Sequence, residues 1–256
     1  MLRPRIIPCL TIDENSDFVK TTNFGNRKYI GDVLNSIKIF NEKDVDEIIV
    51  LDIDASIKKK KPDLNLIEKI ASVCRMPLCY GGGIKSVDDV IKILNLGVEK
   101  VSLNSKALED PKIINQIAKK IGSQSVAVCI DIKQDISSNN FNIYLNNGTK
   151  ILKKNLKDVL LNLQDEGVGE IIINSIDKDG TMEGFDLEFL EKFQLHIKVP
   201  CTLIGGAGSY DDIAKLFKSF KVVGAGCGSL FIYKGVHRAV LINYPNLRDK
   251  LKIIEQ

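Results

Sequence analysis

Asp131 is the residue of this sequence best suited to acid–base chemistry. It ends the strand-like run Cys129-Ile130-Asp131, where a carboxylate could serve as general acid or base. The run Cys9-Leu10-Thr11 in the first half of the chain ends in a hydroxyl instead. A Thr hydroxyl does not titrate near pH 7, so Thr11 cannot replace a carboxylate in proton transfer. The alternative is that Asp131 caps a turn or forms a salt bridge.

Two glycine-rich turns could bind phosphate. Gly82 and Gly206 lie 124 positions apart in similar turns, and Ser105 and Ser229 are separated by the same 124 positions. Because glycine has no Cβ, the backbone N–H groups of such turns can approach an anion closely. The repeat predicts an elongated ligand with a phosphate at each end, and turn geometry alone is the alternative. One candidate site comprises Gly82, Gly83, Asn104 and Ser105, and the other Gly180, Thr181, Gly205, Gly206, Gly228 and Ser229.

Four charged residues open strand-like runs and would lie at the opposite end of the strands from Asp131. They could form a closed ring of two acids and two bases that gates a passage. The alternative is that these four residues are ordinary charged residues at strand starts, solvated by water and not paired in a ring. We call them the charged ring: Arg5, Glu47, Lys100 and Glu170.

The strands that must position these residues alternate with helical patterns. Short runs rich in Ile, Val and Leu are typical of buried parallel strands. Ser86 and Asp110 stand where helix N-caps belong. One domain over residues 1–256 is expected, a (β/α)₈ TIM barrel made of two similar half-barrels, with a doubly wound sheet as the alternative. The predicted strands are Arg5–Ile12, Glu47–Ile53, Met76–Tyr80, Lys100–Asn104, Ser125–Ile132, Glu170–Ser175, Cys201–Ile204 and Val222–Ala225.

Three long loops follow strands and should lie on the face where barrel enzymes hold their chemistry. They span Asp13–Gly31, Ser56–Asp63 and Gln134–Lys150. The last contains Asn146-Asn147-Gly148, which favours a small hairpin. The run Lys58–Lys61 indicates a solvated loop, or alternatively a lid that attracts a phosphorylated substrate.

Composition excludes several classes of protein. The formal charge of +3 is too small to indicate a nucleic-acid partner. No apolar run approaches the roughly 20 residues of a membrane helix, and no signal peptide opens the chain, so a cytoplasmic protein is expected. The six scattered cysteines have no metal-ligand spacing, and His196 and His237 are expected to be structural or at the surface. Neither a metal nor a cofactor is predicted.

The chain resembles the HisF cyclase subunit of imidazole glycerol phosphate synthase over nearly its whole length. The matching stretches are Arg5–Leu10, Leu51–Ser56, Gly81–Ser86, Lys100–Asn104, Ile130–Lys133, Ser175–Asp186 and Gly205–Gly208. The resemblance implies a barrel docked on a HisH-like glutaminase, whose ammonia passes a gate made by the charged ring. At the other end it would meet a bisphosphorylated aminoimidazole precursor, and the products would be imidazole glycerol phosphate and an aminoimidazole carboxamide ribotide. The implied phosphate sites are Gly83, Asn104 and Ser105, and Asp179, Gly180, Gly206, Gly228 and Ser229.

Position 11 departs from the family. The family has catalytic aspartates at the ends of the first and fifth strands; Asp131 matches the second, and Thr11 replaces the first. A positioned acid or base contributes roughly 10²–10⁴-fold, so ordinary cyclase chemistry should be crippled.

A paralogue is therefore expected. The stretches Gly228–Phe231 and Val240–Pro245 resemble the WbuZ-type branch of HisF-like proteins, in which ammonia is thought to reach a separate sugar amidotransferase for amidation of surface glycans. The alternatives are an authentic cyclase that tolerates Thr11, and a scaffold that activates the glutaminase without conducting ammonia.

Overall fold

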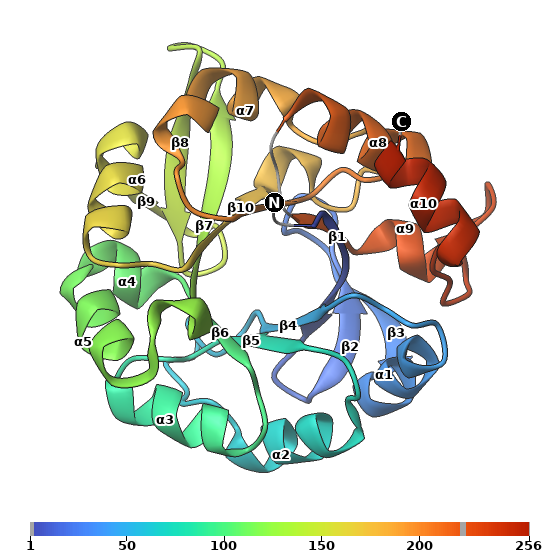
Figure 1. Ribbon diagram of the computed structural model, residues 1–256, viewed down its shortest axis with the longest axis horizontal. Helices are drawn as coiled ribbons and strands as arrows, with labels where there is room; N and C mark the ends of the chain where they lie inside the picture. The colour runs from blue at the N-terminus through green and yellow to red at the C-terminus, as the bar shows by residue number, and fades with distance from the viewer. Residues whose placement is uncertain (1–2, 221–223, 256) are drawn as a thin grey trace.

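Eight parallel strands close into a barrel in the computed structural model, which describes residues 3–220 and 224–255 (Figure 1). The strands follow one another around the barrel in chain order, β7 pairs with β10, and β12 returns to pair with β1. This closure confirms the (β/α)₈ barrel and makes the doubly wound sheet wrong. The strands are β1 (Arg5–Ile12), β4 (Ile48–Asp52), β5 (Leu78–Gly81), β6 (Lys100–Leu103), β7 (Val126–Asp135), β10 (Glu170–Ser175), β11 (Cys201–Ile204) and β12 (Gly224–Cys227).

Helices surround the barrel (Figure 1). Most are short and follow a barrel strand, as a right-handed parallel crossover requires. They are α1 (Val33–Asn41), α2 (Leu64–Val73), α3 (Val87–Asn95), α4 (Ser105–Glu109), α5 (Lys112–Ile121), α6 (Leu156–Asp165), α7 (Leu187–Phe193), α8 (Tyr210–Ser219), α9 (Ser229–Ile232) and α10 (Leu247–Glu255). Short 3₁₀ turns are η1 (Ser123–Ser125), η2 (Ile176–Lys178) and η3 (Gln194–His196). Within the described residues, every helix is too short or too polar to cross a membrane.

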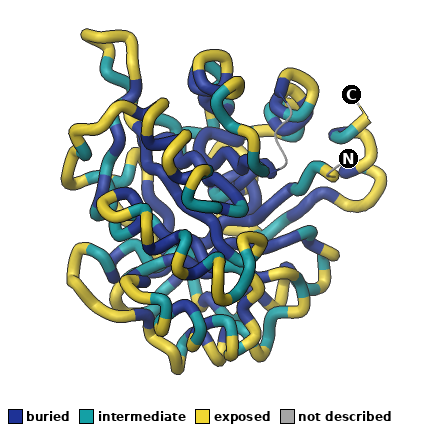
Figure 2. Tube along the Cα trace, turned by 60° about the vertical axis from the view of Figure 1, so that its left-hand side comes forward, coloured by how far each residue is buried: buried dark blue, intermediate teal, exposed yellow. Residues whose placement is uncertain are grey.

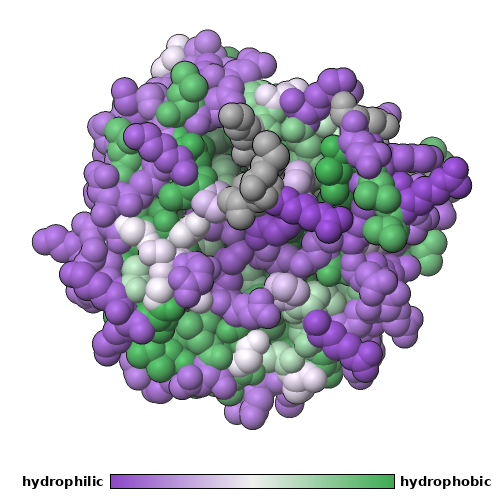
Figure 3. All heavy atoms as spheres, in the orientation of Figure 1, coloured by the Kyte–Doolittle hydropathy of each residue, from purple (hydrophilic) through white to green (hydrophobic). Residues whose placement is uncertain are grey.

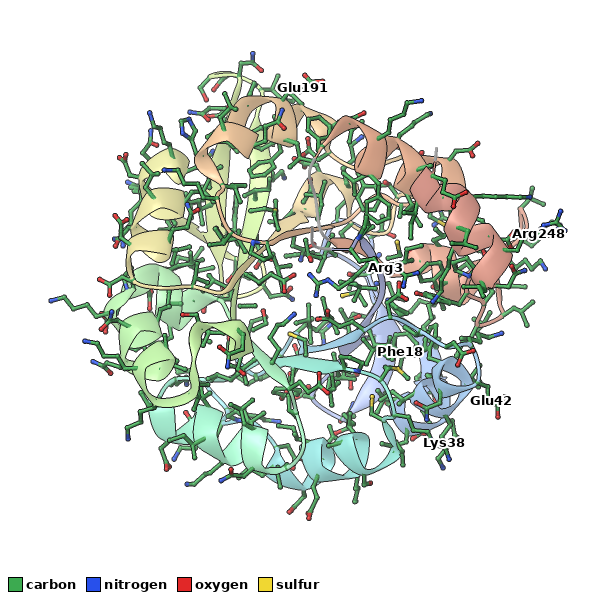
Figure 4. The ribbon with its side chains drawn as sticks, in the orientation of Figure 1. Arg3, Phe18, Lys38, Glu42, Glu191 and Arg248 are labelled. Carbon is green, nitrogen blue, oxygen red and sulfur yellow. The ribbon has the colours of Figure 1, made fainter. Side chains whose placement is uncertain are left out.

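Side chains alternate between the two faces of the barrel sheet. Outward residues such as Ile6 and Val50 pack against the helices, whereas Ile7 and Ile49 belong to a smaller cluster inside the barrel. Figure 2 shows the consequence, a buried centre inside an exposed outer surface. In Figure 4, Arg3 lies near the barrel axis while Arg248 projects at the rim. The period of two therefore decides which residues of each strand face the passage and the pocket.

The two halves of the barrel repeat local structure as well as sequence. Ser86 and Ser209 both cap a helix through a capping box with an aspartate, Asp89 and Asp212 respectively. Asp110, expected to be an N-cap, instead ends α4, and its side chain pairs with Lys106.

Two of the predicted loops form antiparallel strands. The Gln134–Lys150 segment contains β8 (Asn140–Leu145) and leads into β9 (Lys150–Leu152), which confirms the hairpin. The Asp13–Gly31 segment also folds back, as β2 (Asp17–Lys20) and β3 (Lys28–Asp32), because Asp13 accepts backbone hydrogen bonds that close a turn after β1. The Lys58–Lys61 run is exposed, as expected of a solvated loop. A last hairpin joins β13 (Tyr233–Lys234) to β14 (Ala239–Val240). In the predicted strand Val222–Ala225, positions 222 and 223 lie outside the described residues.

Candidate functional site

A pocket lined by polar side chains, glycine turns and apolar side chains opens at the carboxyl ends of the barrel strands. It gathers side chains and turns from both halves of the chain, because parallel strands deliver their carboxyl ends to one face. Of the residues expected there, Thr181 is missing from the lining, and its hydroxyl bonds to the Lys178 carbonyl instead. Those that line the pocket include Thr11, Gly83, Asn104, Ser105, Asp131, Asp179, Gly180, Gly206, Gly228 and Ser229.

Asp131 lies on the inner face of β7 and is buried between two amides. Asn104 Nδ2 donates to Asp131 Oδ2 at 2.9 Å, and Asn174 Nδ2 donates to Oδ1 at 3.1 Å. Burial raises the pKa of Asp131 to about 7, against the opposing effect of the two amides. A carboxyl group that titrates near pH 7 can both accept and donate a proton, so Asp131 is equipped for acid–base chemistry.

Thr11 faces the same pocket, but its hydroxyl already has a partner. The hydroxyl donates to the backbone carbonyl of Val19, in the strand β2 that folds back on β1. Of Thr11 and Asp131, only Asp131 therefore offers a carboxyl group to the pocket, and the Thr11 hydroxyl stabilises the pairing of β1 with β2.

The first candidate phosphate site contains two side chains with other partners. Asn104 holds Asp131, as described above, and also donates to the Cys129 carbonyl. Ser105 Oγ accepts from the Asn146 backbone N–H at 3.0 Å and lies 3.2 Å from Asn146 Oδ1. The Asn146 turn between β8 and β9 thus lies directly on this end of the pocket.

The second candidate phosphate site contains a buried cation that the sequence did not reveal. Lys20 in β2 is only 5% exposed, and a Cβ on Gly228 would lie 2.4 Å from its Nζ. Asp179 faces the same pocket but accepts from the Thr21 hydroxyl at 2.6 Å and from the Phe24 N–H at 3.2 Å. The ammonium group of Lys20, with the Gly228–Ser229 turn, makes this end suited to an anion.

The glycines of these turns are needed for close backbone approach. Gly206 has φ 100°, and a Cβ there would lie 2.0 Å from the Gly184 carbonyl oxygen. A Cβ on Gly180 would lie 2.2 Å from the Thr21 carbonyl oxygen. Packing against neighbouring loops is therefore sufficient to require glycine at both positions, whatever they bind.

The charged ring lies at the other end of the barrel, where its members pair alternately. Arg5 pairs with Glu47 and, at 2.8 Å, with Glu170, while Lys100 Nζ lies 2.9 Å from Glu47 and 2.6 Å from Glu170. Burial would raise the pKa of Glu170, but Lys100 and Arg5 outweigh it and lower that pKa. Burial would likewise lower the pKa of Lys100, and the two acids raise it. Glu170 and Lys100 are therefore held in their charged forms.

An apolar layer separates the charged ring from the pocket. Burial raises the pKa of the Cys9 thiol to about 11 and that of Cys79 and Cys129 well above the ordinary value, so these thiols stay protonated and unreactive. The Ser102 hydroxyl, buried in β6 between Lys100 and Asn104, has no hydrogen-bond partner among the described residues. The layer comprises Ile7, Cys9, Ile49, Cys79, Ala127, Cys129, Ile172 and Ile204.

Sequence reasoning missed Asn174 and Lys20. A signal for Asn174 existed, since it follows Glu170 and Ile172 at the period of two that places all three inside the barrel. Lys20 had no such signal, because it reaches the pocket only when β2 folds back. Neither His196 nor His237 lines the pocket. Among the described residues, no cluster of His, Cys, Asp and Glu side chains could hold a metal ion.

Fold and site define a (β/α)₈ barrel with a pocket at the carboxyl ends of its strands and a charged ring at the other end. The family model described as "Histidine biosynthesis protein" matches residues 5–238. The chain therefore belongs to the HisF family of histidine biosynthesis proteins.

Full-length relatives agree with this assignment. A protein of Leptospira borgpetersenii named "Putative imidazole glycerol phosphate synthase subunit HisF" is 53% identical over 250 residues, 98% of each chain. A protein of Pseudomonas aeruginosa named "Putative imidazole glycerol phosphate synthase subunit hisF2" is 46% identical over 253 residues. The match covers 99% of this chain and 100% of that protein. Imidazole glycerol phosphate synthase subunit HisF of Lactococcus lactis is 40% identical over 233 residues, 91% of this chain and 90% of its own. The narrower resemblance to the WbuZ-type branch stays a prediction.

Proposed function

We propose that this protein is the HisF-like subunit of a glutamine amidotransferase complex that conducts ammonia without ordinary cyclase activity. A HisH-like glutaminase would dock at the end that carries the charged ring. Ammonia would pass the ring, cross the barrel and leave through the pocket for amidation of a surface-glycan sugar. The observation that carries the proposal is Thr11, whose hydroxyl is bonded to Val19 where the family has a catalytic carboxylate.

The barrel interior suits neutral ammonia better than ammonium. Transfer of an isolated cation into an apolar layer costs far more than transfer of a small neutral amine. Since the charged ring is closed in the free subunit, passage requires one of its ion pairs to open when the partner docks.

The decisive experiment is ammonium-dependent turnover of the bisphosphorylated precursor by the wild type and by Thr11→Asp. We expect no turnover by the wild type and a gain with the variant. In the variant, the new carboxylate at position 11 would face the Val19 carbonyl and could not donate a hydrogen bond to it. Circular dichroism must therefore show that the variant is folded. Turnover by the wild type would return the protein to histidine biosynthesis.

The glycan role has a genetic test. Deletion of the gene should alter amidation of surface sugars and leave growth without histidine intact. Histidine auxotrophy after the deletion would refute the role.

An authentic cyclase is the second candidate, and the surroundings of Asp131 favour it. The two amides and the pKa near 7 preserve an acid–base group that ammonia delivery alone does not need. The turnover experiment above separates the two functions.

A further inference from the structure

Helix α10 and the segment before it reach two members of the charged ring through the residues beside them. We propose that Tyr244 and Lys250 are positioning residues that hold the charged ring closed in the free subunit, with Asp46 as the link between them. The proposal rests on the proposed function only in the role that it gives to the ring. We call Asp46, Tyr244 and Lys250 the α10 clasp.

Tyr244 holds the start of β1. Its hydroxyl donates to the Ile6 carbonyl at 2.7 Å, and its ring packs edge-on against Phe231 of α9, with 5.1 Å between the ring centroids. Tyr244 is only 8% exposed, and burial raises the pKa of its phenol, so the hydroxyl keeps its proton and stays a donor. Since Ile6 adjoins Arg5, this bond fixes the backbone from which one cation of the ring extends.

Asp46 connects β1 to α10. Its Oδ2 accepts from the Ile6 N–H at 3.0 Å, and its Oδ1 accepts from Lys250 Nζ at 2.9 Å. The pairing of β1 with β4 begins at Cys9, so before that point side chains take the place of a neighbouring strand. The carboxylate of Asp46 therefore ties the first residues of β1 to the helix.

Lys250 holds the loop that leads to Glu47. Besides Asp46, its Nζ donates to the Asp44 carbonyl at 2.6 Å, and it lies 4.7 Å from the centroid of the Tyr244 ring. Lys250 is only 6% exposed, so salt and water screen these interactions less than those of a surface lysine. Since Asp46 adjoins Glu47, Lys250 fixes the backbone from which one acid of the ring extends.

The ring tolerates little movement at these two points. Arg5 pairs with both acids, and Glu47 pairs with both cations. Because Glu47 is only 5% exposed, little water can replace a lost partner. A shift of either backbone segment would lengthen ion pairs between buried charges, whose attraction is strong at low dielectric. Among the described residues, the side-chain hydrogen bonds of the α10 clasp go to neighbours of the ring and not to its members.

Double-mutant cycles measured by urea unfolding test the proposal. Glu47→Gln removes the charge of the acid, after which its exact place matters less. Lys250→Met should therefore lower the unfolding equilibrium in favour of the folded state by a factor that is at least about fivefold larger in the wild type than in Glu47→Gln. Lys252→Met is the matched control, since Lys252 is exposed on the same helix, and its effect should be the same in both backgrounds. A ratio below about fivefold for Lys250→Met would overturn the proposal for that residue.

A milder variant gives an independent test. Tyr244→Phe removes only a hydroxyl and keeps the aromatic ring. Burial would raise the pKa of Glu170, but Lys100 and Arg5 outweigh it. A displaced Arg5 would weaken that opposition, so Tyr244→Phe should raise the pKa of Glu170, measured from the ¹³C resonance of its side-chain carboxyl. The control Tyr29→Phe changes an exposed tyrosine and should leave this pKa as it is.

An unchanged pKa of Glu170 in Tyr244→Phe would show that the hydroxyl supports the fold without placing the ring. Both measurements use the free subunit and need neither ammonia nor a glutaminase. Their failure therefore leaves the test of ammonia delivery intact, and a failure of ammonia delivery leaves the α10 clasp intact.

Discussion

The Thr11 hydroxyl and the Val19 carbonyl form a hydrogen bond that ties β1 to the returning strand β2. The same strand carries Lys20 into the pocket. Thr11 therefore helps to place Lys20, a buried residue that lines the pocket.

Thr11→Val should destabilise the protein by about 1 kcal/mol, because the Val19 carbonyl loses its side-chain donor while the side-chain volume is kept. Urea unfolding measures the change. Thr22→Val is the control, since Thr22 is exposed in the same hairpin and makes no side-chain hydrogen bond among the described residues. Equal effects of the two substitutions would mean that the Thr11 bond contributes nothing.

Lys100→Met should be far more damaging, by about 3–5 kcal/mol, because it leaves Glu47 and Glu170 buried with one cation between them. The control Lys92→Met removes an exposed pair with Asp88 and should leave the unfolding midpoint in urea unchanged. A midpoint that also stays unchanged in Lys100→Met would show that the charged ring does not form.

In a complex with a glutaminase, Lys100→Met should also uncouple glutamine hydrolysis from amidation, because the variant removes one cation from the gate. The measurement compares glutamate released with amidated product formed. Intact coupling would favour a scaffold that does not conduct ammonia.

The contribution of Asp131 to the stability of the protein should fall as the pH rises from about 4 to about 7. Asp131 has an ordinary pKa of 3.8 in the unfolded chain and a pKa of about 7 in the folded protein. In this window the unfolded state loses a proton that the folded state keeps, so unfolding becomes easier with rising pH. Roughly three pH units at about 1.4 kcal/mol each set an upper limit near 4 kcal/mol.

Urea unfolding of the wild type and of Asp131→Asn at several pH values isolates this contribution. The difference in unfolding free energy between the two proteins should drift across the window and level off above pH 7. A difference that is independent of pH would show that Asp131 titrates normally.

Gly206→Ala should destabilise the protein by about 3 kcal/mol or more, because the added Cβ meets the Gly184 carbonyl at 2.0 Å in addition to its positive φ. Gly235 also has a positive φ, 72°, but a Cβ there would meet open space. Gly235→Ala should therefore cost only about 1 kcal/mol. Thermal unfolding compares the two. Similar losses would show that backbone conformation alone requires glycine at position 206.

The surface is mixed in character. Figure 3 shows hydrophilic side chains over most of one face, with hydrophobic patches between them. The residues of the pocket and of the charged ring, in contrast, are mostly buried or half-buried.

The sequence predicted the barrel because its signals are local and repeated. Short apolar strands, helix caps such as Ser86, and glycine turns 124 positions apart can be read without knowledge of distant contacts. The same alternation placed Arg5 and Glu170 at strand starts and Asp131 at a strand end, so the ends of the barrel to which these side chains belong were also predictable.

The sequence alone determined the barrel, its repeat and the presence of a hydroxyl at position 11. Only the tertiary structure decided what the polar groups do, because their partners come from segments far apart in the chain. Thr11 bonds to a returning strand, Ser105 to a hairpin 41 positions away, and Lys20 is buried by the turn of the last barrel strand. Hydrogen bonds and desolvation depend on such distant neighbours, and spacing along the chain does not encode them.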